Sequence, residues 1–364
     1  MEVYVGMDVH CKESVFVAED GEGKVVCEGR IPTTPEGFRL LRTQYGLEPG
    51  TSVALETGTS AFFAVRHLAR LEFEPVVVNA HEVRKQASRP NQKSDRRDAI
   101  ELCEGLRRGS YRSIIHVPDA NVQRLRQTLS RRRHFIRLMT RETNAVKHLL
   151  RSEGLGDLAR SLKTEVAWDR LHKRLAFAAE LQGLFSCHHE VWSCCRKQVE
   201  HLDGELEELA KFFPEAMRHL RTIPGVGTIV GLTLIAVLSD VERFPSAKHV
   251  ASYAGLIPST YQTGERNYQG RITKKGSGEL RAMLCEAAHQ AAKARSPLHP
   301  YFAKLCAKRG YKMAVVAIAH RLLRISWAML RHGTEFQVER LGVEEGPFEV
   351  KSTRYYRFKE TSAA

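Results

Sequence analysis

The segment Val5-Gly-Met-Asp8-Val-His10 places an acidic residue directly after a short apolar run, near the start of the 364-residue chain. A second apolar run ends in the same way at Val53-Ala-Leu-Glu56. Two further acids, Asp95 and Asp98, lie three residues apart where Ser94 is expected to cap a helix. Gathered carboxylates repel one another unless a cation joins them, so the four acids predict a site for divalent metal.

The elements expected around these acids alternate between strand and helix. Apolar runs bounded by turn residues predict five strands, at 3–7, 14–18, 24–28, 53–56 and 75–79. Helices are expected after the N-cap Thr34, over 61–71, and from Ser94 to Leu106. Three early strands followed by a βαβα order are typical of an RNase H-like fold, although generic α/β folds share parts of this order.

Oxygen ligands in such a site favour Mg²⁺ or Mn²⁺ over zinc. Asp95 and Asp98 share one face of their helix, so with Asp8 and Glu56 they could hold two ions that polarise a phosphate. Basic residues close to these acids suit phosphate contact, with plain surface charge as the alternative. They are Lys85, Lys93, Arg96 and Arg97.

Between about 115 and 215 the strand signal disappears, and apolar residues recur at helical spacing in two stretches. They predict two long helices that form an antiparallel or intermolecular coiled coil. The first stretch also carries a dense set of arginines, which favours nucleic-acid contact over a merely solvated face. The arginines that we expect to make this contact are Arg124, Arg131, Arg132 and Arg133.

The charge balance agrees with a polyanionic partner. The chain has 56 Lys and Arg against 42 Asp and Glu, a net charge of +14. A basic excess of this size favours phosphate neutralisation, although a solvated surface is the alternative. The longest apolar stretch, Gly227–Leu238, is shorter than the roughly 20 residues of a membrane span, so no membrane partner is expected.

Eight cysteines show no spacing typical of a disulfide framework, so reduced thiols of a cytoplasmic protein are expected. Cys187-His188-His189, followed by Cys194-Cys195, lacks a paired Cys-x-x-Cys element and does not favour structural zinc.

The segment Arg221-Thr-Ile-Pro-Gly225-Val-Gly227 precedes an apolar helix and is typical of a helix-hairpin-helix element. Gly225 and Gly227 would let a DNA phosphate approach the N–H groups at the start of that helix. A tight turn between two helices, for which glycine is equally useful, is the alternative.

Two later blocks, Gly255-Leu-Ile-Pro and Gly270-Arg-Ile-Thr-Lys-Lys-Gly276, complete a recognisable pattern. Together with the four acids and the Ile-Pro-Gly-x-Gly hairpin, they resemble the DEDD transposases of bacterial insertion sequences. This group includes the bridge-RNA-guided recombinases and is related to the Piv DNA invertase. The resemblance extends from Asp8 to about Gly333.

The resemblance implies a fold class of α/β plus α in four parts. A RuvC-like domain at 1–112 would bind Mg²⁺ (or Mn²⁺) through the four acids, and a helical coiled-coil linker would occupy 113–215. A mostly α-helical transposase domain would follow at 216–335, and a polar tail at 336–364.

The family's nucleophile is a serine, in a Ser-Gly pair eight residues after the glycine of Gly-Leu-x-Pro. That position is Thr263 in this chain. Threonine keeps the hydroxyl but adds a methyl that restricts χ1, so this departure puts the efficiency of the chemistry in question. Residues that we expect to clamp phosphates around it are Arg266, Arg271, Lys274, Lys275 and Arg281.

The resemblance further implies an enzyme that cuts and rejoins target and donor DNA, guided by a structured RNA, in the nucleoid of a bacterial cytoplasm. Family members are homotetramers, built as dimers of dimers, in which one subunit's acids meet another's nucleophile. Two other functions are left open. One is a metal-dependent nuclease or junction resolvase that activates water, and the other is an RNA- or DNA-binding protein with weakened or lost catalysis.

Overall fold

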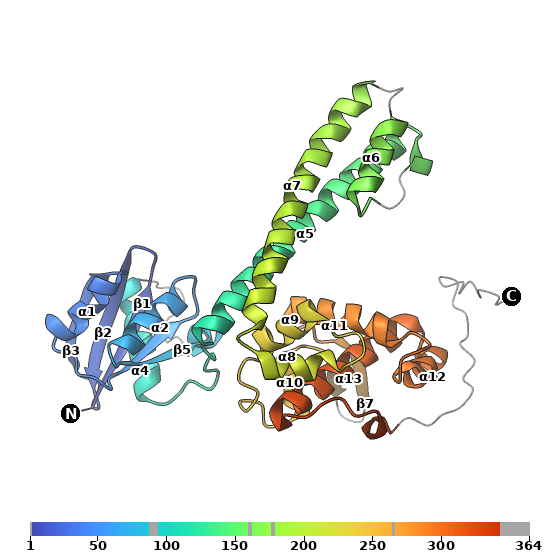
Figure 1. Cartoon of the computed structure of the whole chain (residues 1–364). Coiled ribbons are helices and arrows are strands. Elements are labelled where there is room, and N and C mark those ends of the chain that lie inside the picture. The colour runs from blue at the N-terminus through green and yellow to red at the C-terminus, as the bar shows by residue number, and fades with distance from the viewer. Residues whose placement is uncertain (1, 87–93, 159–161, 176–178, 264–265, 343–364) are drawn as a thin grey trace. The chain divides into compact units, whose positions relative to one another are not determined.

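The computed structural model describes residues 2–86, 94–158, 162–175, 179–263 and 266–342, without the side chains at 179, 263, 266, 267 and 269. The chain packs as two compact units, Met1–Val117 and Pro118–Ala364, coloured in Figure 1 from blue to red along the chain. The boundary expected near residue 112 thus lies close to Val117. Residues 118–215 and 216–335 pack within one unit, and the separation of the segments 113–215 and 216–335 into two domains stays a prediction.

Unit 1 is built on one five-stranded sheet. The strands pair in the order β3-β2-β1-β4-β5, antiparallel between β1, β2 and β3 and parallel between β1, β4 and β5. This order is consistent with an RNase H-like domain, and all five strands expected from the sequence are confirmed. Their bounds are β1 (Val3–Val9), β2 (Glu13–Asp20), β3 (Val25–Pro32), β4 (Ser52–Glu56) and β5 (Glu74–Val78).

Helices cover both faces of this sheet. Helices α1 (Pro35–Thr43) and α2 (Ala61–Arg70) bury Phe38 and Leu68 against the face that carries Val5 and Met7. Helix α4 (Asp95–Arg107) buries Leu102 against Ala54 on the opposite face. The expected N-caps are present, since Thr34 and Ser94 accept hydrogen bonds from the backbone N–H groups of Gly37 and Arg97. The short helix α3 (Ala80–Gln86) was not expected from the sequence.

Gly6 sets how closely α4 approaches the sheet. A Cβ added at Gly6 would lie 2.0 Å from the carbonyl oxygen of Ala99 and 2.3 Å from the backbone nitrogen of Cys103. The Cys103 thiol also donates to the carbonyl oxygen of Tyr4 at 3.0 Å. Only glycine leaves room for the helix backbone here, so the middle of α4 lies directly over β1.

Gly6→Ala should therefore lower the free energy of unfolding by about 3 kcal/mol, because a backbone rather than a flexible side chain must move. Gly21→Ala is the matched control, since a Cβ at Gly21 would meet nothing within 4 Å. Urea denaturation of the full chain compares the two variants. Equal free energies of unfolding for the two variants would show that the packing of α4 on β1 tolerates a side chain at residue 6.

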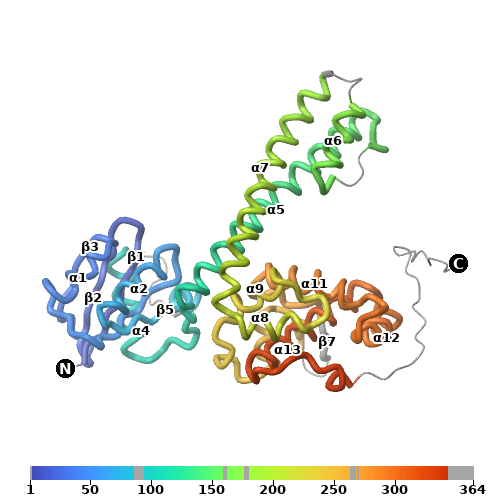
Figure 2. The backbone as a smooth tube through the Cα atoms, in the orientation of Figure 1, coloured from blue at the N-terminus to red at the C-terminus, as the bar shows by residue number. Residues whose placement is uncertain are grey.

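In unit 2, two long helices lie side by side along their length (Figures 1 and 2). They are α5 (Ala120–Ser152) and α7 (Ala179–Ala210), with a 3₁₀ turn (Gly156–Leu158) and α6 (Glu165–Arg174) between them in sequence. Leu125 near the start of α5 clusters with Leu206 near the end of α7, while Leu150 clusters with Phe185. The two helices are therefore antiparallel, and the prediction of two long helices is confirmed. The coiled-coil geometry stays a prediction.

In the described residues of unit 2 after α7, the regular elements are helices and one hairpin of two strands, β6 (Pro258–Thr263) and β7 (Arg266–Ile272), which the sequence did not predict. Its helices are α8 (Pro214–Arg221), α9 (Thr228–Leu238), α10 (Ala247–Tyr253), α11 (Gly278–Ala291), α12 (His299–Arg309) and α13 (Tyr311–His332), followed by a 3₁₀ turn (Val338–Leu341).

Among the described residues, α13 is the one helix long and apolar enough to cross a membrane by length and composition. Its Ile318, Leu322 and Trp327 belong to the buried core of unit 2, which accounts for its apolar character. Of the tail expected at 336–364, residues 336–342 are described and the remainder lies outside the described residues.

Candidate functional site

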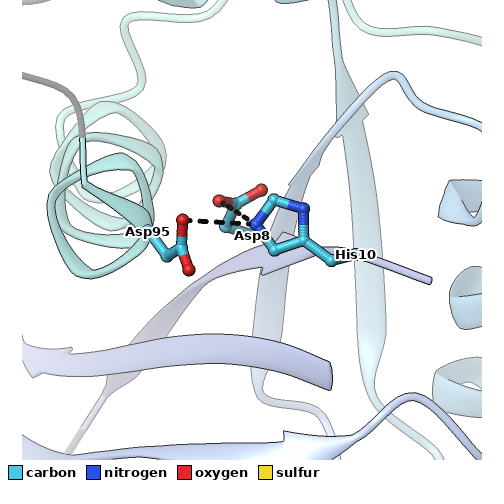
Figure 3. Close-up of side chains that lie close together, drawn as sticks. All are labelled: Asp8, His10 and Asp95. Carbon is cyan, nitrogen blue, oxygen red and sulfur yellow. Dashed lines mark ion pairs between the residues drawn. The ribbon is translucent and has the colours of Figure 1, made fainter. Parts of the chain in front are cut away.

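Three side chains converge at the carboxyl end of β1 in unit 1 (Figure 3). The His10 Nε2 atom lies 3.1 Å from Asp8 Oδ2 and 3.4 Å from Asp95 Oδ1. One potential ligand atom from each of the three residues lies within 4.8 Å of the others. Asp8 comes from β1, His10 directly follows that strand, and Asp95 is the first residue of α4. Two of the four predicted acids are thus brought together.

The strand period explains why Asp8 points toward α4. Gly6 faces the backbone of α4, and side chains two residues apart lie on the same face of a strand. Asp8 and His10 therefore follow Gly6 on that face. The side chain of Asp8 is 17% exposed and that of Asp95 43%, so the site is open to solvent on one side.

Glu56 and Asp98 lie close in the fold to this group. Met7 of β1 pairs with Leu55 of β4, so the next positions along the two parallel strands are Asp8 and Glu56. Asp98 lies in the first turn of α4, one helical turn after Asp95. The register and the helical period therefore place all four predicted acids near one end of the sheet, while direct convergence is found for Asp8 and Asp95 with His10.

Two titratable side chains near these acids have raised pKa values. Burial raises the pKa of the Glu101 carboxyl, and the negative charge of Asp98 raises it further. Burial likewise raises the pKa of the Tyr111 phenol, with smaller contributions from acids that include Glu101 and Glu56.

Carboxylate oxygens together with an imidazole nitrogen suit a divalent ion such as Mn²⁺ or Mg²⁺, so the donor set fits the metal that the sequence predicts. His10 was missed as a candidate. Its signal in the sequence is the spacing of two residues from Asp8, which places both side chains on one strand face.

The basic residues expected to contact phosphate near the acids differ in whether they pair with a carboxylate. Arg96 makes an ion pair with Glu28 at 2.7 Å, and Arg97 lies 3.9 Å from Glu101. Lys85 is exposed at the end of α3, and Lys93 lies outside the described residues. Two arginines not singled out from the sequence approach the acids: Arg30 lies 3.9 Å from Asp95, and Arg84 lies 4.0 Å from Glu56.

On α5, the four arginines expected to contact nucleic acid fall into two pairs. Arg124 and Arg131 are exposed. Arg132 makes an ion pair with Asp203 of α7, and Arg133 lies 3.6 Å from Glu279 of α11. Arg132 and Arg133 therefore also link helices within unit 2, whereas Arg124 and Arg131 are available at the surface.

The two hairpin glycines between α8 and α9 have different surroundings. Gly225 has a φ of +87°, and a Cβ there would lie 2.4 Å from the carbonyl oxygen of Ala287 in α11, so packing inside the unit requires glycine. Gly227 is the N-cap of α9, and a Cβ there would meet nothing within 4 Å. The backbone at Gly227 is therefore unobstructed on the side where a Cβ would lie. The contact with DNA stays a prediction.

The two later sequence blocks pack against each other at the base of the β6–β7 hairpin. A Cβ at Gly255 would lie 2.0 Å from the carbonyl oxygen of Lys275, and one at Gly276 would lie 1.9 Å from that of Tyr253. Both glycines have positive φ, +65° and +83°. Arg281 donates to the carbonyl oxygens of Ala254 and Lys275 at 3.0 and 3.1 Å.

Arg281, which the sequence predicts as a phosphate ligand, thus bonds to backbone carbonyl oxygens at the base of the hairpin and stabilises it. Arg271, Lys274 and Lys275 are exposed. Thr263 is the last residue of β6 and pairs in register with Arg266, the first residue of β7, so the backbone places both at the tip of the hairpin.

The cysteine and histidine group near residue 190 is not brought together as a metal site. His188 contacts Glu142 at 2.6 Å and His189 contacts Glu165 at 2.8 Å, so each pairs with a carboxylate. Among the described residues, the one group of three or more potential ligands is that of Asp8, His10 and Asp95.

Two family models match the chain in order. A DEDD transposase model matches residues 5–153, and a model described as transposase IS116/IS110/IS902 family matches residues 217–303. The first match contains all four predicted acids, and the second contains the hairpin glycines and Thr263. Together the two matches cover more than half of the chain.

Similar proteins carry related descriptions. A transposase for insertion sequence element IS1328 from Yersinia enterocolitica is 28% identical over 312 residues, which cover 82% of this chain and 89% of that protein. A transposase for insertion sequence element IS1111A from Coxiella burnetii is 27% identical over 250 residues, or 65% of this chain and 66% of that protein.

A shorter match is more similar. The pilin gene-inverting protein of Moraxella lacunata is 35% identical over 144 residues, which cover 38% of this chain and 45% of that protein. Since both family models describe transposases of one kind and match the chain in its two units, the chain belongs to the IS116/IS110/IS902 family of transposases.

Proposed function

We propose that this chain is a DNA transposase or site-specific recombinase that cuts and rejoins DNA strands with a hydroxyl nucleophile and a carboxylate-bound metal. The convergence of Asp8 and Asp95 with His10 carries this proposal, because these three side chains offer a place for the metal that the reaction would use. Asp8, Glu56, Asp95 and Asp98 would hold Mg²⁺ or Mn²⁺. When bound, the ion would polarise the phosphate and stabilise developing charge on oxygen.

In the proposed reaction, the hydroxyl oxygen of Thr263 forms a bond to the phosphorus of a DNA phosphodiester. The bond between that phosphorus and the 3′ oxygen breaks, so the strand ends in a free 3′-OH while the phosphate stays on the protein. The hydroxyl gives up one proton and the departing 3′ oxygen takes up one, which balances the step. The covalent phosphoester conserves the bond energy needed for rejoining.

The partners in this proposal are target and donor DNA and a structured guide RNA, bound by a homotetramer in the bacterial cytoplasm. The net charge of +14 supports a nucleic-acid partner. Exposed Arg124 and Arg131 on α5, and the open N-terminus of α9 at Gly227, offer surfaces for its phosphates.

A strand-exchange assay tests the proposal. The purified full chain, combined with the RNA and DNA that flank its own gene, should join donor and target strands with Mg²⁺ and give no product with EDTA. Cleavage without joining, and without any protein–DNA adduct, would instead indicate a nuclease that activates water. Tight binding with neither product would indicate a protein that binds nucleic acid without catalysis.

His10 should contribute directly to metal binding. His10→Asn should weaken Mn²⁺ binding about tenfold and Mg²⁺ binding less, since imidazole nitrogen is a better ligand for Mn²⁺ than for Mg²⁺. The measurement is a titration of free Mn²⁺ by electron paramagnetic resonance, which does not depend on activity.

The control is His201→Asn, which changes an exposed histidine on α7 that lies 3.4 Å from Glu205. Mn²⁺ binding by His10→Asn equal to that of the control would exclude His10 as a ligand.

A further inference from the structure

Two tyrosines face solvent side by side on the β6–β7 hairpin. Tyr261 and Tyr268 are direct cross-strand partners, with ring centroids 6.5 Å apart and ring planes inclined by 32°. Their side chains are 65% and 68% exposed, which makes them the most exposed of the large hydrophobic side chains that the structure describes. Aromatic rings of this size usually bury most of their surface, so an exposed pair is available to a binding partner.

Contacts within the hairpin and at its base support the positions of the two tyrosine rings. A Cβ at Gly270 would lie 2.5 Å from the Ser259 hydroxyl oxygen and 3.3 Å from Cε2 of Tyr261, so the glycine leaves space beside the Tyr261 ring. The Ser259 hydroxyl donates to the carbonyl oxygen of Arg271 at 3.1 Å and ties the strands together. Since Gly255 and Gly276 fix the base of the hairpin, the two rings have a defined position within unit 2.

The charged side chains described on the hairpin and at its base are cationic, and Tyr261 lies close in sequence to the proposed nucleophile. In residues 258–277, the charged side chains that the structure describes are Arg271, Lys274 and Lys275, and all are exposed. Thr263 lies two residues beyond Tyr261 in the same strand. A hairpin that carries an exposed aromatic pair and positive charge suits a ligand that has both flat rings and phosphates.

We propose that Tyr261 and Tyr268 form a stacking platform for a nucleobase of the DNA strand next to the bond that Thr263 attacks. The inference rests on the proposed function and adds a binding site to it. Unpaired bases stack on aromatic side chains with little dependence on sequence, while nearby cations neutralise the backbone. A base held in this way would keep the adjacent phosphate in reach of the hairpin tip during cutting and rejoining.

A binding measurement without catalysis tests the platform. The probe is a fluorescein-labelled single strand of mixed sequence, about 20 nucleotides long so that it exceeds a typical stacking site, followed by anisotropy in EDTA. Tyr261→Ala with Tyr268→Ala in the full chain should weaken binding about tenfold or more, whereas the corresponding double Phe variant should stay within about twofold, because it keeps both rings. A duplex of the same sequence should be affected less.

Phe212→Ala is the matched control, because Phe212 is 58% exposed and lies outside the hairpin. Equal binding by the double Ala variant and this control would overturn the platform, as would an equal loss with the double Phe variant. Loss of self-association by the double Ala variant with unchanged DNA binding would identify the pair as a contact between copies and would also overturn it. Because EDTA removes any metal-dependent reaction, these outcomes are independent of whether Thr263 forms a covalent adduct.

Discussion

Asp8→Asn should reduce metal-dependent strand cleavage by about three orders of magnitude, since a bound metal contributes several kcal/mol to charge stabilisation in phosphoryl transfer. Asparagine has nearly the same shape as aspartate but lacks the charge. Asp8 lies 3.1 Å from His10 and belongs to the group that includes Asp95, so its loss removes one of the two acids brought together at this end of the sheet. Cleavage rates of the full chain at saturating Mg²⁺ check this result.

Metal binding gives an independent measure for the same variant. Mn²⁺ should raise the melting temperature of the unaltered chain and have little effect on Asp8→Asn, because ligands that bind only the folded state stabilise it. Glu72→Gln is the control. It removes an exposed acid that pairs with Arg42 at 3.3 Å, and an exposed pair contributes little to stability. Cleavage by Asp8→Asn at the rate of this control would remove the metal centre from the mechanism.

Thr263→Ala should abolish the covalent protein–DNA adduct, and Thr263→Ser should form it about three to ten times faster than the natural chain. Alanine has no hydroxyl, whereas serine keeps the hydroxyl and removes the methyl that restricts χ1. In general, a side chain that must leave its preferred rotamer costs about 0.5–1.5 kcal/mol, and the freer χ1 of serine lowers this cost during attack. Trapping on a nicked substrate, followed by denaturing electrophoresis, measures the adduct.

Thr260→Ala provides the comparison, because Thr260 is an exposed threonine of the same strand β6. It should leave adduct formation unchanged. An adduct that persists in Thr263→Ala would assign the nucleophile to another hydroxyl of the hairpin, and Ser259 or Tyr261 would then be examined in the same way.

The fold of unit 1 could be predicted from the sequence because its signals are local. Thr34 and Ser94 cap helices where expected, and strands buried on both faces leave continuous apolar runs such as Val53–Leu55. The β6–β7 hairpin was missed because its strands carry polar residues and exposed tyrosines rather than an alternating apolar pattern.

The candidate site was predictable in part. Asp8 and Asp95 could be expected together because a strand end and a helix start meet at one end of the sheet. The role of Gly6 as the point of contact with Ala99, which sets that meeting, depends on a backbone distance that no local pattern encodes. The same holds for Arg281, whose bond to the carbonyl oxygen of Ala254 joins residues 27 positions apart in the sequence.

The glycines at the root of the β6–β7 hairpin have a practical consequence for protein engineering. Gly255 and Gly276 fix the hairpin through backbone contacts, while Tyr261 and Tyr268 contribute almost nothing to the buried interior. Residues 261 and 268 can therefore be diversified in a combinatorial library with little effect on folding yield. Such a library would allow selection of variants that bind single-stranded DNA more tightly or more weakly than the unaltered chain.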